Sequence, residues 1–548
     1  MKAYAALAGL TVATLIEAIL IPQFVPFLRP FGGVMRMLCQ FLLFNAIALL
    51  FYLIIIYPRF ISPLRNVPGP SGGHLFTGQF VPIRLSSPPG AQLSKWMETI
   101  PNEGLLRARY ILGADAIIPT NEAMIKTILH DNAYDYEKQP RVTSMFRQVL
   151  GGGLLLSEGD DHKSQRKQMA SSFSIQVTRD LYPLIWAKAL ELISMIKEEV
   201  PKAEFDFTTW CTRVTLDIMG TAGFGKDFES LKKNRHDLIV QDYQALVKPS
   251  SNVFVLFMLG IVFDPEIQAH IPGLSAAKEM ARISAHLLGW AQDMAAQRRA
   301  ELANTRTAEL ERNKRRDILS LLIRNSNLSD RDLANQALTM MAAGHESTSL
   351  TVAWCIYLLG ENPIIQDQLR AEIRAHLPSP RGPAGERLTA AMIDPLALLN
   401  GVTNETLRLY PTIPVTTRKA VRDTRVGPHE VPAGTTVFIS PWAINRSTSI
   451  WGEDAEEFIP QRWIDKNGRP NKTAGLKNNY NIMTFLHGPR ACIGQDFARA
   501  QLKCLVAAIV GRYEIRITRN KSKYYPAGIY TTKAANGMWL QFDEVEGW

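Results

Sequence analysis

The stretch that decides the fold is Phe485-Leu486-His487-Gly488-Pro489-Arg490-Ala491-Cys492-Ile493-Gly494. Its two glycines and its proline predict a tight backbone loop that can approach a flat ligand closely. The thiolate of Cys492 is a strong donor to iron, and Arg490 can bind an acidic group on the same ligand. A haem is such a flat, acidic, iron-bearing ligand. We expect Phe485 to shield the sulfur from water.

Residues 495–509 follow the loop with apolar side chains at helical spacing, which predicts a helix. Its N-terminus would lie beside the sulfur and lower the pKa of the Cys492 thiol. A lone cysteine in a turn is usually structural. The flanking residues reverse that interpretation, because the stretch fills every position of Phe-x-x-Gly-x-Arg-x-Cys-x-Gly. It resembles the haem-binding signature of the cytochrome P-450 family.

The resemblance covers roughly Val67 to Phe542 and implies a cytochrome P-450 fold, mainly α with a small β region (α+β), preceded by an N-terminal membrane anchor. It implies a haem-thiolate monooxygenase, with Cys492 as the iron ligand of haem b. NADPH would serve indirectly through an NADPH-cytochrome P-450 reductase, and cytochrome b5 is a further possible partner. Residues 74–548 would form the catalytic domain, at the endoplasmic reticulum membrane and facing the cytosol. The loop residues expected to contact the haem are Phe485, Gly488, Arg490, Cys492 and Gly494.

The composition is that of an ordinary globular chain, with 46% hydrophobic and 20% charged residues over 548 positions. No Gly/Ser-rich linker, repeat or long charge run divides it, so one large domain is expected. The net charge of +10 suits an anionic membrane surface or an acidic protein partner. The basic residues are scattered without a zinc-finger or RNP pattern, so no nucleic-acid partner is expected. Five widely spaced cysteines without a CxxC motif favour a reducing compartment.

The N-terminal residues 1–60 are expected to anchor the chain in a membrane. Residues 37–57 are apolar over a length that can span a bilayer. Residues 3–21 are also apolar but carry Glu17, so they remain open as a second span, an interfacial helix or a signal-like segment. We favour retention over cleavage. The proline- and glycine-rich residues 61–73 then form a hinge, and an ordinary loop is the alternative.

Three further residues are expected to hold haem propionates because of the resemblance. His162 stands where the family usually has tryptophan, and Arg166 follows one helical turn later. A solvated basic helix face is an equal alternative for this pair. Arg418 lies in an extended segment after Pro411 and is implied to contact a propionate. By the same resemblance, residues 234–276 would form a substrate-access lid, with core packing as the alternative.

Ser329-Asp330-Arg331-Asp332 resembles a capping box, and the apolar pattern that follows predicts one long helix ending near Pro363. An acid beside hydroxyls in the middle of an apolar helix is unfavourable unless a site uses it. The family pattern there is Ala/Gly-Gly-x-Asp/Glu-Thr-Thr/Ser, which gives Glu346 and Ser347 the role of delivering protons. Ser347 replaces the usual threonine, so its hydroxyl is kept with looser positioning. A kinked core helix is the alternative.

A second helix, ended by Pro411, places Glu405 and Arg408 three residues apart on one face. Alone, such a pair is usually a weak surface salt bridge. The family resemblance adds Arg462 and implies a buried network that supports the haem-loop side of the fold. Near the cysteine, Arg499 and Lys503 could attract an acidic reductase surface or could be ordinary solvated residues.

Three other functions stay open at this stage. A haem-thiolate isomerase or dehydratase would use a peroxide substrate without a reductase, a haem sensor would consume no substrate, and a membrane structural protein would hold no haem. The monooxygenase is preferred because Glu346, the adjacent hydroxyls and the hinge suit reductase-driven chemistry. A lipophilic substrate is expected, such as a terpenoid, polyketide, sterol or fatty acid, in a fungal type of specialised metabolism.

Overall fold

A computed structural model describes residues 9, 12, 14, 16, 17, 34–200, 203–232, 239, 241, 242, 245, 275–304, 317–380, 387–520, 523–528 and 530–548. The lid expected over residues 234–276 lies almost entirely outside the described residues. The main helices are α2 (Val34–Phe51), α3 (Phe80–Arg84), α4 (Ala91–Thr99), α5 (Glu122–Lys126), α6 (Pro140–Leu150), α7 (Gly159–Met169), α8 (Ile175–Glu199), α9 (Phe207–Ile218), α13 (Ser275–Asn304), α15 (Ile318–Asn325), α16 (Asp330–Glu361), α17 (Pro363–His376), α18 (Ala390–Ile393), α19 (Ala397–Leu409), α20 (Pro441–Ile444), α21 (Thr448–Trp451) and α22 (Gln495–Arg512).

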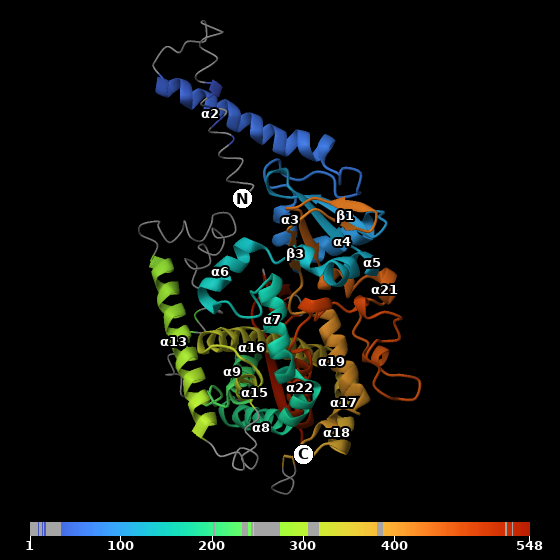
Figure 1. Ribbon diagram of the computed structural model, residues 1–548. Coiled ribbons are helices and arrows are strands. Elements are labelled where there is room, and N and C mark those ends of the chain that lie inside the picture. The colour runs from blue at the N-terminus through green and yellow to red at the C-terminus, as the bar shows by residue number, and fades with distance from the viewer. Residues whose placement is uncertain are drawn as a thin grey trace.

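Shorter helical turns extend or connect these helices. They are η2 (Tyr52–Ile61), η3 (Ile111–Gly113), η4 (Thr127–Asp131), η5 (Ala133–Asp135), η6 (Ala170–Phe173), η7 (Met219–Phe224), η8 (Pro460–Trp463), η9 (Asn479–Asn481) and η10 (Gly488–Arg490). The expectation of a mainly α fold with a small β region is confirmed (Figure 1).

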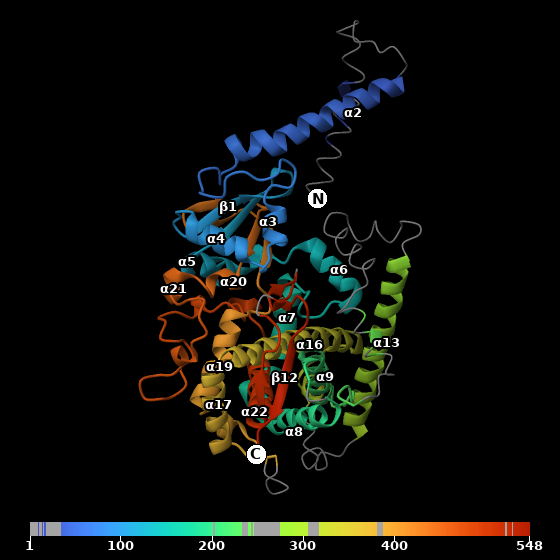
Figure 2. The same cartoon turned by 180° about the vertical axis from the view of Figure 1, so that it is seen from behind.

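The long helix α16 runs through the middle of the helical part and packs against α9, α13, α19 and α22 (Figures 1 and 2). Its start has the N-cap contact of the predicted capping box, since the hydroxyl of Ser329 accepts a hydrogen bond from the backbone N–H of Asp332 at 3.1 Å; that hydroxyl also donates to the carboxylate of Asp332 at 2.6 Å. The N-cap contact satisfies one of the N–H groups that every helix start leaves unpaired. Most of the C-terminal half of α16 is buried, so its position is fixed by packing.

The strands form two main sheets. The five-stranded sheet has the order β1 (Leu105–Arg109), β2 (Asp115–Pro119), β8 (Thr436–Ile439), β5 (Thr416–Ala420), β3 (Tyr136–Glu137). In it only β2 and β8 pair in parallel. The three-stranded sheet has the order β4 (Phe205–Asp206), β12 (Trp539–Glu544), β9 (Tyr513–Arg516). Two hairpins are β6 (Thr424–Val426) with β7 (His429–Val431) and β10 (Pro526–Ala527) with β11 (Lys533–Ala534). The C-terminal strands thus build a separate sheet and a hairpin.

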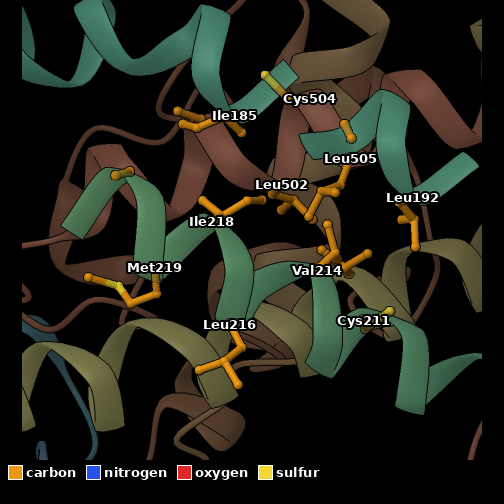
Figure 3. Close-up of a cluster of buried hydrophobic side chains, with 14 of the residues drawn as sticks. Ile185, Leu192, Cys211, Val214, Leu216, Ile218, Met219, Leu502, Cys504 and Leu505 are labelled. Atoms are coloured by element: carbon orange, nitrogen blue, oxygen red, sulfur yellow. The ribbon is translucent and has the colours of Figure 1, made fainter. Parts of the chain in front are cut away.

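The largest hydrophobic cluster lies where α8, α9 and α22 meet beneath α16 (Figure 3). Figure 3 shows side chains of the three helices turned toward one another, among them Ile185 from α8, Val214 from α9 and Leu502 from α22. Each of these three is at most 1% exposed. Since α22 follows the cysteine loop directly, this packing fixes the position of the loop.

One helical segment among the described residues, Arg36–Ile61, is long and apolar enough to cross a membrane. Its helical backbone continues through η2 to Ile61, four residues past the expected end at Tyr57. Figures 1 and 2 show α2 leading away from the body on the side of β1. Part of the expected hinge is packed: Val67 is 7% exposed, and the carbonyl of Pro68 accepts a hydrogen bond from the N–H of Arg107 at 2.8 Å.

Candidate active site

The loop from Phe485 to Gly494 is closed by its own backbone. The N–H of Cys492 donates to the carbonyl of Phe485 at 2.9 Å, and that of Ala491 donates to the carbonyl of Gly488 at 3.0 Å. Gly488 has φ +75°, and a Cβ on it would lie 1.9 Å from the carbonyl oxygen of Leu129. Only glycine fits there, because both the positive φ and the close approach exclude a side chain. The loop geometry therefore explains the glycine of the motif.

The Cys492 side chain is exposed toward a cavity that it lines. The surrounding protein raises the pKa of the thiol by burial, while the N–H of Gly494 and the Arg166 guanidinium act in the opposite direction. The expected lowering of this pKa is therefore wrong for the net shift, since burial outweighs the helix N-terminus. A thiolate at this position therefore needs a nearby cation to share its charge, and a bound iron ion would be such a cation.

The cavity, with the solvent-open space at its mouth included, measures about 950 Å³ and lies between two walls. The cysteine loop and the start of α22 form one wall, and the middle of α16 forms the other; α7 contributes His162, Arg166 and Met169. The lining residues on the two walls include Phe485, Arg490, Cys492, Gly494, Ala498 and Gln501 on the first, and Thr339, Met340, Ala343, Gly344, Ser347 and Thr348 on the second. The cavity thus brings the predicted iron ligand and the predicted relay serine to one space.

Positive charge gathers at the cavity. Lys138, Arg166 and Arg490 all line it. Lys138 pairs with Glu158 at 3.0 Å, Arg490 pairs with the same carboxylate, and Arg166 donates to the carbonyl of Ala491 at 2.6 Å. Burial lowers the pKa of Lys138 to about 8, with Arg418 and Arg490 acting in the same direction against Glu158. Two cations therefore share one carboxylate, which leaves capacity for a further anion.

His162 is 2% exposed, and its Nδ1 lies 3.2 Å from the hydroxyl of Tyr134. Burial, with Lys138 and Arg490 nearby, lowers the pKa of His162 to about 4, so the ring is neutral at physiological pH. Arg418 is buried but does not belong to the lining residues. Its guanidinium donates to the carbonyl of Thr417 at 2.8 Å, and burial lowers its pKa to about 10.

On the opposite wall, the hydroxyl of Ser347 donates to the carbonyl of Ala343 at 2.6 Å and faces the cavity. Glu346 lies beside it in the chain but is absent from the lining residues; its carboxylate pairs with Lys533 of β11 at 2.7 Å. A Cβ on Gly344 would lie 2.7 Å from the sulfur of Met219. A side chain at this position would therefore require the flexible side chain of Met219 to move, and Gly344 also lines the cavity.

The three network residues come together away from the cavity. Arg408 donates to both oxygens of Glu405, at 2.7 and 2.9 Å, and the Nε of Arg462 lies 3.4 Å from Glu405. The side chains of Glu405 and Arg408 are 0% exposed. The pair is therefore deeply buried, as the family resemblance implies. The spacing of the two residues alone would have indicated a surface salt bridge.

Arg499 and Lys503 differ from the expectation of free surface cations. Arg499 donates to the side chain of Asn404 and lies 5.2 Å above the ring of Phe485. Lys503 pairs with Asp394 at 3.1 Å, and its side chain is 12% exposed. Both cations are used within the fold, which weakens the proposal that they attract a reductase.

Sequence reasoning missed several cavity residues, chiefly Lys138, Met219 and Gln501. Lys138 follows a two-residue strand that has no strong pattern, so no signal identified it. Gln501 was visible as a polar residue within the apolar pattern that follows Cys492. It is 0% exposed, and neither its amide nitrogen nor its oxygen has a hydrogen-bond partner among the described residues.

The residues present fit a haem. The thiol of Cys492 faces the cavity, a glycine-bearing loop allows a close approach, and the cations share one carboxylate, which suits propionates. The buried amide of Gln501 is also typical of a site that holds a bound group, since buried polar atoms in native proteins normally have partners.

A family model described as Cytochrome P-450 matches residues 76–533. The chain is 35% identical over 513 residues to cytochrome P-450 monooxygenase sphH of Aspergillus fumigatus, covering 92% of each chain. It is 32% identical over 530 residues to cytochrome P-450 monooxygenase FUM15 of Gibberella moniliformis, covering 88% of each. Cytochrome P-450 monooxygenase ptmK of Penicillium ochrochloron is 31% identical over 505 residues, covering 89% of this chain and 95% of the relative.

Proposed function

Because this chain belongs to the cytochrome P-450 family and is a haem-thiolate monooxygenase, we propose that it inserts one oxygen atom of dioxygen into a lipophilic substrate, with electrons from an NADPH-dependent reductase. The observation that carries the proposal is the single cavity that joins Cys492 on one wall to Ser347 on the other. Its relatives are named monooxygenases, which favours this function over the isomerase and the sensor.

We assign the haem to this cavity, with Cys492 as its iron ligand and Arg166, Arg490 and Lys138 toward its propionates. When bound, the haem would supply dioxygen activation and oxidising power, and thiolate ligation by Cys492 would favour O–O cleavage. In this assignment the neutral ring of His162, which is hydrogen-bonded to the hydroxyl of Tyr134, would serve the haem as a hydrogen-bonding group and not as a cation. In this assignment Arg418 has a supporting role: its buried charge acts on Arg490, one of the cations that line the cavity.

We assign Ser347 the role of passing a proton into the cavity. The support for this role is that Ser347 lines the cavity, where its hydroxyl donates to the carbonyl of Ala343. Glu346 faces Lys533, so a proton that enters through Glu346 must first pass this ion pair. The proposed chain of groups would run from Lys533 and Glu346 through water to Ser347, whose hydroxyl would be the last proton donor before the cavity.

We predict that Ser347→Ala lets oxygen consumption continue while product formed per NADPH falls by about tenfold. This is less than the ~100-fold or more that a positioned proton donor contributes, because water can partly replace a hydroxyl. NADPH use, oxygen uptake and product are measured in one assay. Ser349→Ala is the matched control: its hydroxyl donates to the carbonyl of Glu346 on the same helix and lies outside the cavity. Unchanged coupling in Ser347→Ala would remove Ser347 from the relay.

We predict that Lys533→Met lowers product per NADPH by at most about fivefold. The Lys533 side chain is 40% exposed, so its ion pair with Glu346 is worth no more than about 1 kcal/mol. Losing it frees the carboxylate to adopt other orientations. Lys523→Met, at an exposed position near the same hairpin, is the control and should retain normal coupling. The positioning role also requires that Lys533→Arg restores coupling; if Arg and Met behave alike, charge at this position is irrelevant.

The substrate is proposed to be a terpenoid, polyketide, sterol or fatty acid in fungal specialised metabolism. The support is the largely apolar lining, including Leu154, Phe173 and Met340, together with the fungal sources of the relatives. The proposed location is the endoplasmic reticulum membrane, with the catalytic domain facing the cytosol and a reductase, with or without cytochrome b5, as partner.

The decisive experiment feeds candidate lipophiles to membranes that contain the chain, with and without reductase and NADPH, and identifies products by mass. A product that carries one oxygen from labelled dioxygen and requires the reductase supports the proposal. Turnover of a peroxide substrate without NADPH would instead support the isomerase or dehydratase. Haem binding without any turnover across the panel would support the sensor.

A further inference from the structure

Asn45 interrupts the apolar helix α2 and bonds outside that helix. Its amide nitrogen donates to the carboxylate of Glu17 at 2.6 Å and to the hydroxyl of Thr14 at 3.2 Å. Thr14 is 5% exposed, although it belongs to the apolar residues 3–21. These contacts join the first apolar segment to the second.

The two sides of α2 differ in exposure in a way that agrees with this contact. At 100° per residue, one side of the helix carries side chains that are 56–65% exposed, namely Leu43, Phe44, Ile47 and Phe51. The other side is half-buried and carries Leu38, Phe41, Asn45 and Leu49. Asn45 therefore lies on a face of α2 that another segment covers.

The first segment has the complementary pattern at its described positions. Thr14 and Glu17, three residues apart in helical backbone, are buried and half-buried. Val12 and Ile16, on the other face, are 54% and 50% exposed. At the described positions, the polar residues of each segment thus lie on its covered face and the exposed face is apolar, which is the arrangement of two helices packed in lipid.

We infer that residues 3–21 and 36–61 form a membrane hairpin held by a clamp of Thr14, Glu17 and Asn45. In hydrocarbon, an ionisable or amide group is costly unless it finds a polar partner, and these three provide partners for one another. Both segments are long enough to cross a bilayer.

The register favours an antiparallel pair. Glu17 precedes Pro22 by five residues and Asn45 follows Arg36 by nine; at the 1.5 Å rise per residue that the proposed helices would have, these separations correspond to about 7 and 14 Å. These depths differ by less than two helical turns. The N-terminus and the catalytic domain then share one side of the membrane, and the N-terminal segment is retained rather than removed as a signal.

The packing of the two segments can be tested with pairs of introduced cysteines in the full-length chain. The chain carries Cys39→Ala and is studied in membranes. Thr14→Cys with Leu49→Cys places both thiols on the covered faces and leaves the bond between Glu17 and Asn45 intact. Thr14→Cys with Ile47→Cys is the matched control on the exposed face. Mild oxidation should give at least tenfold more intrachain disulfide in the first pair. Equal yields, or disulfides only between chains, would overturn the hairpin.

Topology mapping in sealed microsomes tests the orientation. A tag before residue 3 should be digested by external protease, and a glycosylation acceptor placed within residues 22–33 should be glycosylated. A protected tag means a single span, and loss of the tag from mature protein means cleavage; either result overturns the inference, as does an unmodified acceptor.

The clamp itself is tested in the Thr14→Cys, Leu49→Cys pair. Asn45→Leu should lower disulfide yield at least threefold, whereas Gln40→Leu, an equivalent change at an exposed position of α2, should not. If the two substitutions act alike, the polar clamp does not hold the helices together. Both readouts are independent of oxygenase activity, so they stand or fall separately from the proposed function.

Discussion

Replacing Cys492 by alanine is expected to abolish oxygenase activity while leaving a folded chain. The side chain lies at the end of a loop closed by backbone hydrogen bonds, which alanine keeps, including the N–H of Cys492 to the carbonyl of Phe485. The sulfur faces the cavity and packs little, so its removal costs little stability. What is lost is the thiolate ligand. No other described cysteine can substitute for it, because Cys211, Cys355 and Cys504 are buried elsewhere and Cys39 lies on α2.

The measurement is the absorption spectrum of the reduced carbon monoxide complex, together with turnover. Wild type should give the thiolate-type Soret band, and Cys492→Ala should give none. Turnover should fall by at least about 1,000-fold, because the whole reaction depends on this one iron ligand. Cys504→Ala makes the same substitution at a buried position of α22 and should retain the band. A thiolate-type band in Cys492→Ala would refute the assignment of the iron ligand.

Much of the cysteine loop and of α16 could be predicted from sequence because local contacts determine both. Gly488 is required by its own φ and by one close carbonyl, and Ser329 caps the helix three residues ahead. Such constraints act over a few residues, so they leave a readable spacing. The same holds for Glu405 and Arg408, which are one turn apart on α19.

Contacts between distant residues left no comparable signal. Glu346 forms an ion pair with Lys533 although 187 positions separate them. Lys503, which was considered as a surface cation, forms an ion pair with Asp394 within the fold. Lys138, a cation that lines the cavity, could not be predicted because it follows a strand of only two residues. The pKa of Cys492 went the other way from expectation because burial depends on the whole fold, whereas the helix N-terminus beside it is local.

Replacing Arg408 by methionine is expected to destabilise the fold more than any other single change considered for this chain. The guanidinium is fully buried and bonds to both oxygens of Glu405. It also donates to three backbone carbonyls, those of Asn445, Ala455 and Glu457, at 2.9, 2.6 and 3.0 Å. Methionine fills part of the volume but satisfies none of these acceptors. Removing one partner of a buried ion pair typically costs about 3–5 kcal/mol.

The remaining donors to Glu405 cannot compensate for that loss. The indole N–H of Trp463 and the backbone N–H of Ile459 already donate to its carboxylate, at 2.8 and 3.1 Å, and Arg462 lies at 3.4 Å and is shared with Asp454. The carboxylate would stay buried with its main counter-charge gone. Arg408→Lys keeps the charge without the planar fork, so we expect it to recover only part of the stability.

Chemical unfolding of the detergent-solubilised chain, followed by tryptophan fluorescence, measures this effect close to its source, since the guanidinium of Arg408 lies 4.7 Å above the ring of Trp451. Arg469→Met is the control, because Arg469 also pairs with a carboxylate one turn away, Asp465, but is 71% exposed; we expect it to change the free energy of unfolding by less than about 1 kcal/mol. The contrast between the two arginines isolates burial as the cause. If Arg408→Met unfolds at the same denaturant concentration as Arg469→Met, the buried network does not support the haem-loop side of the fold, and α22 and its loop must be held by the hydrophobic cluster with α8 and α9 alone.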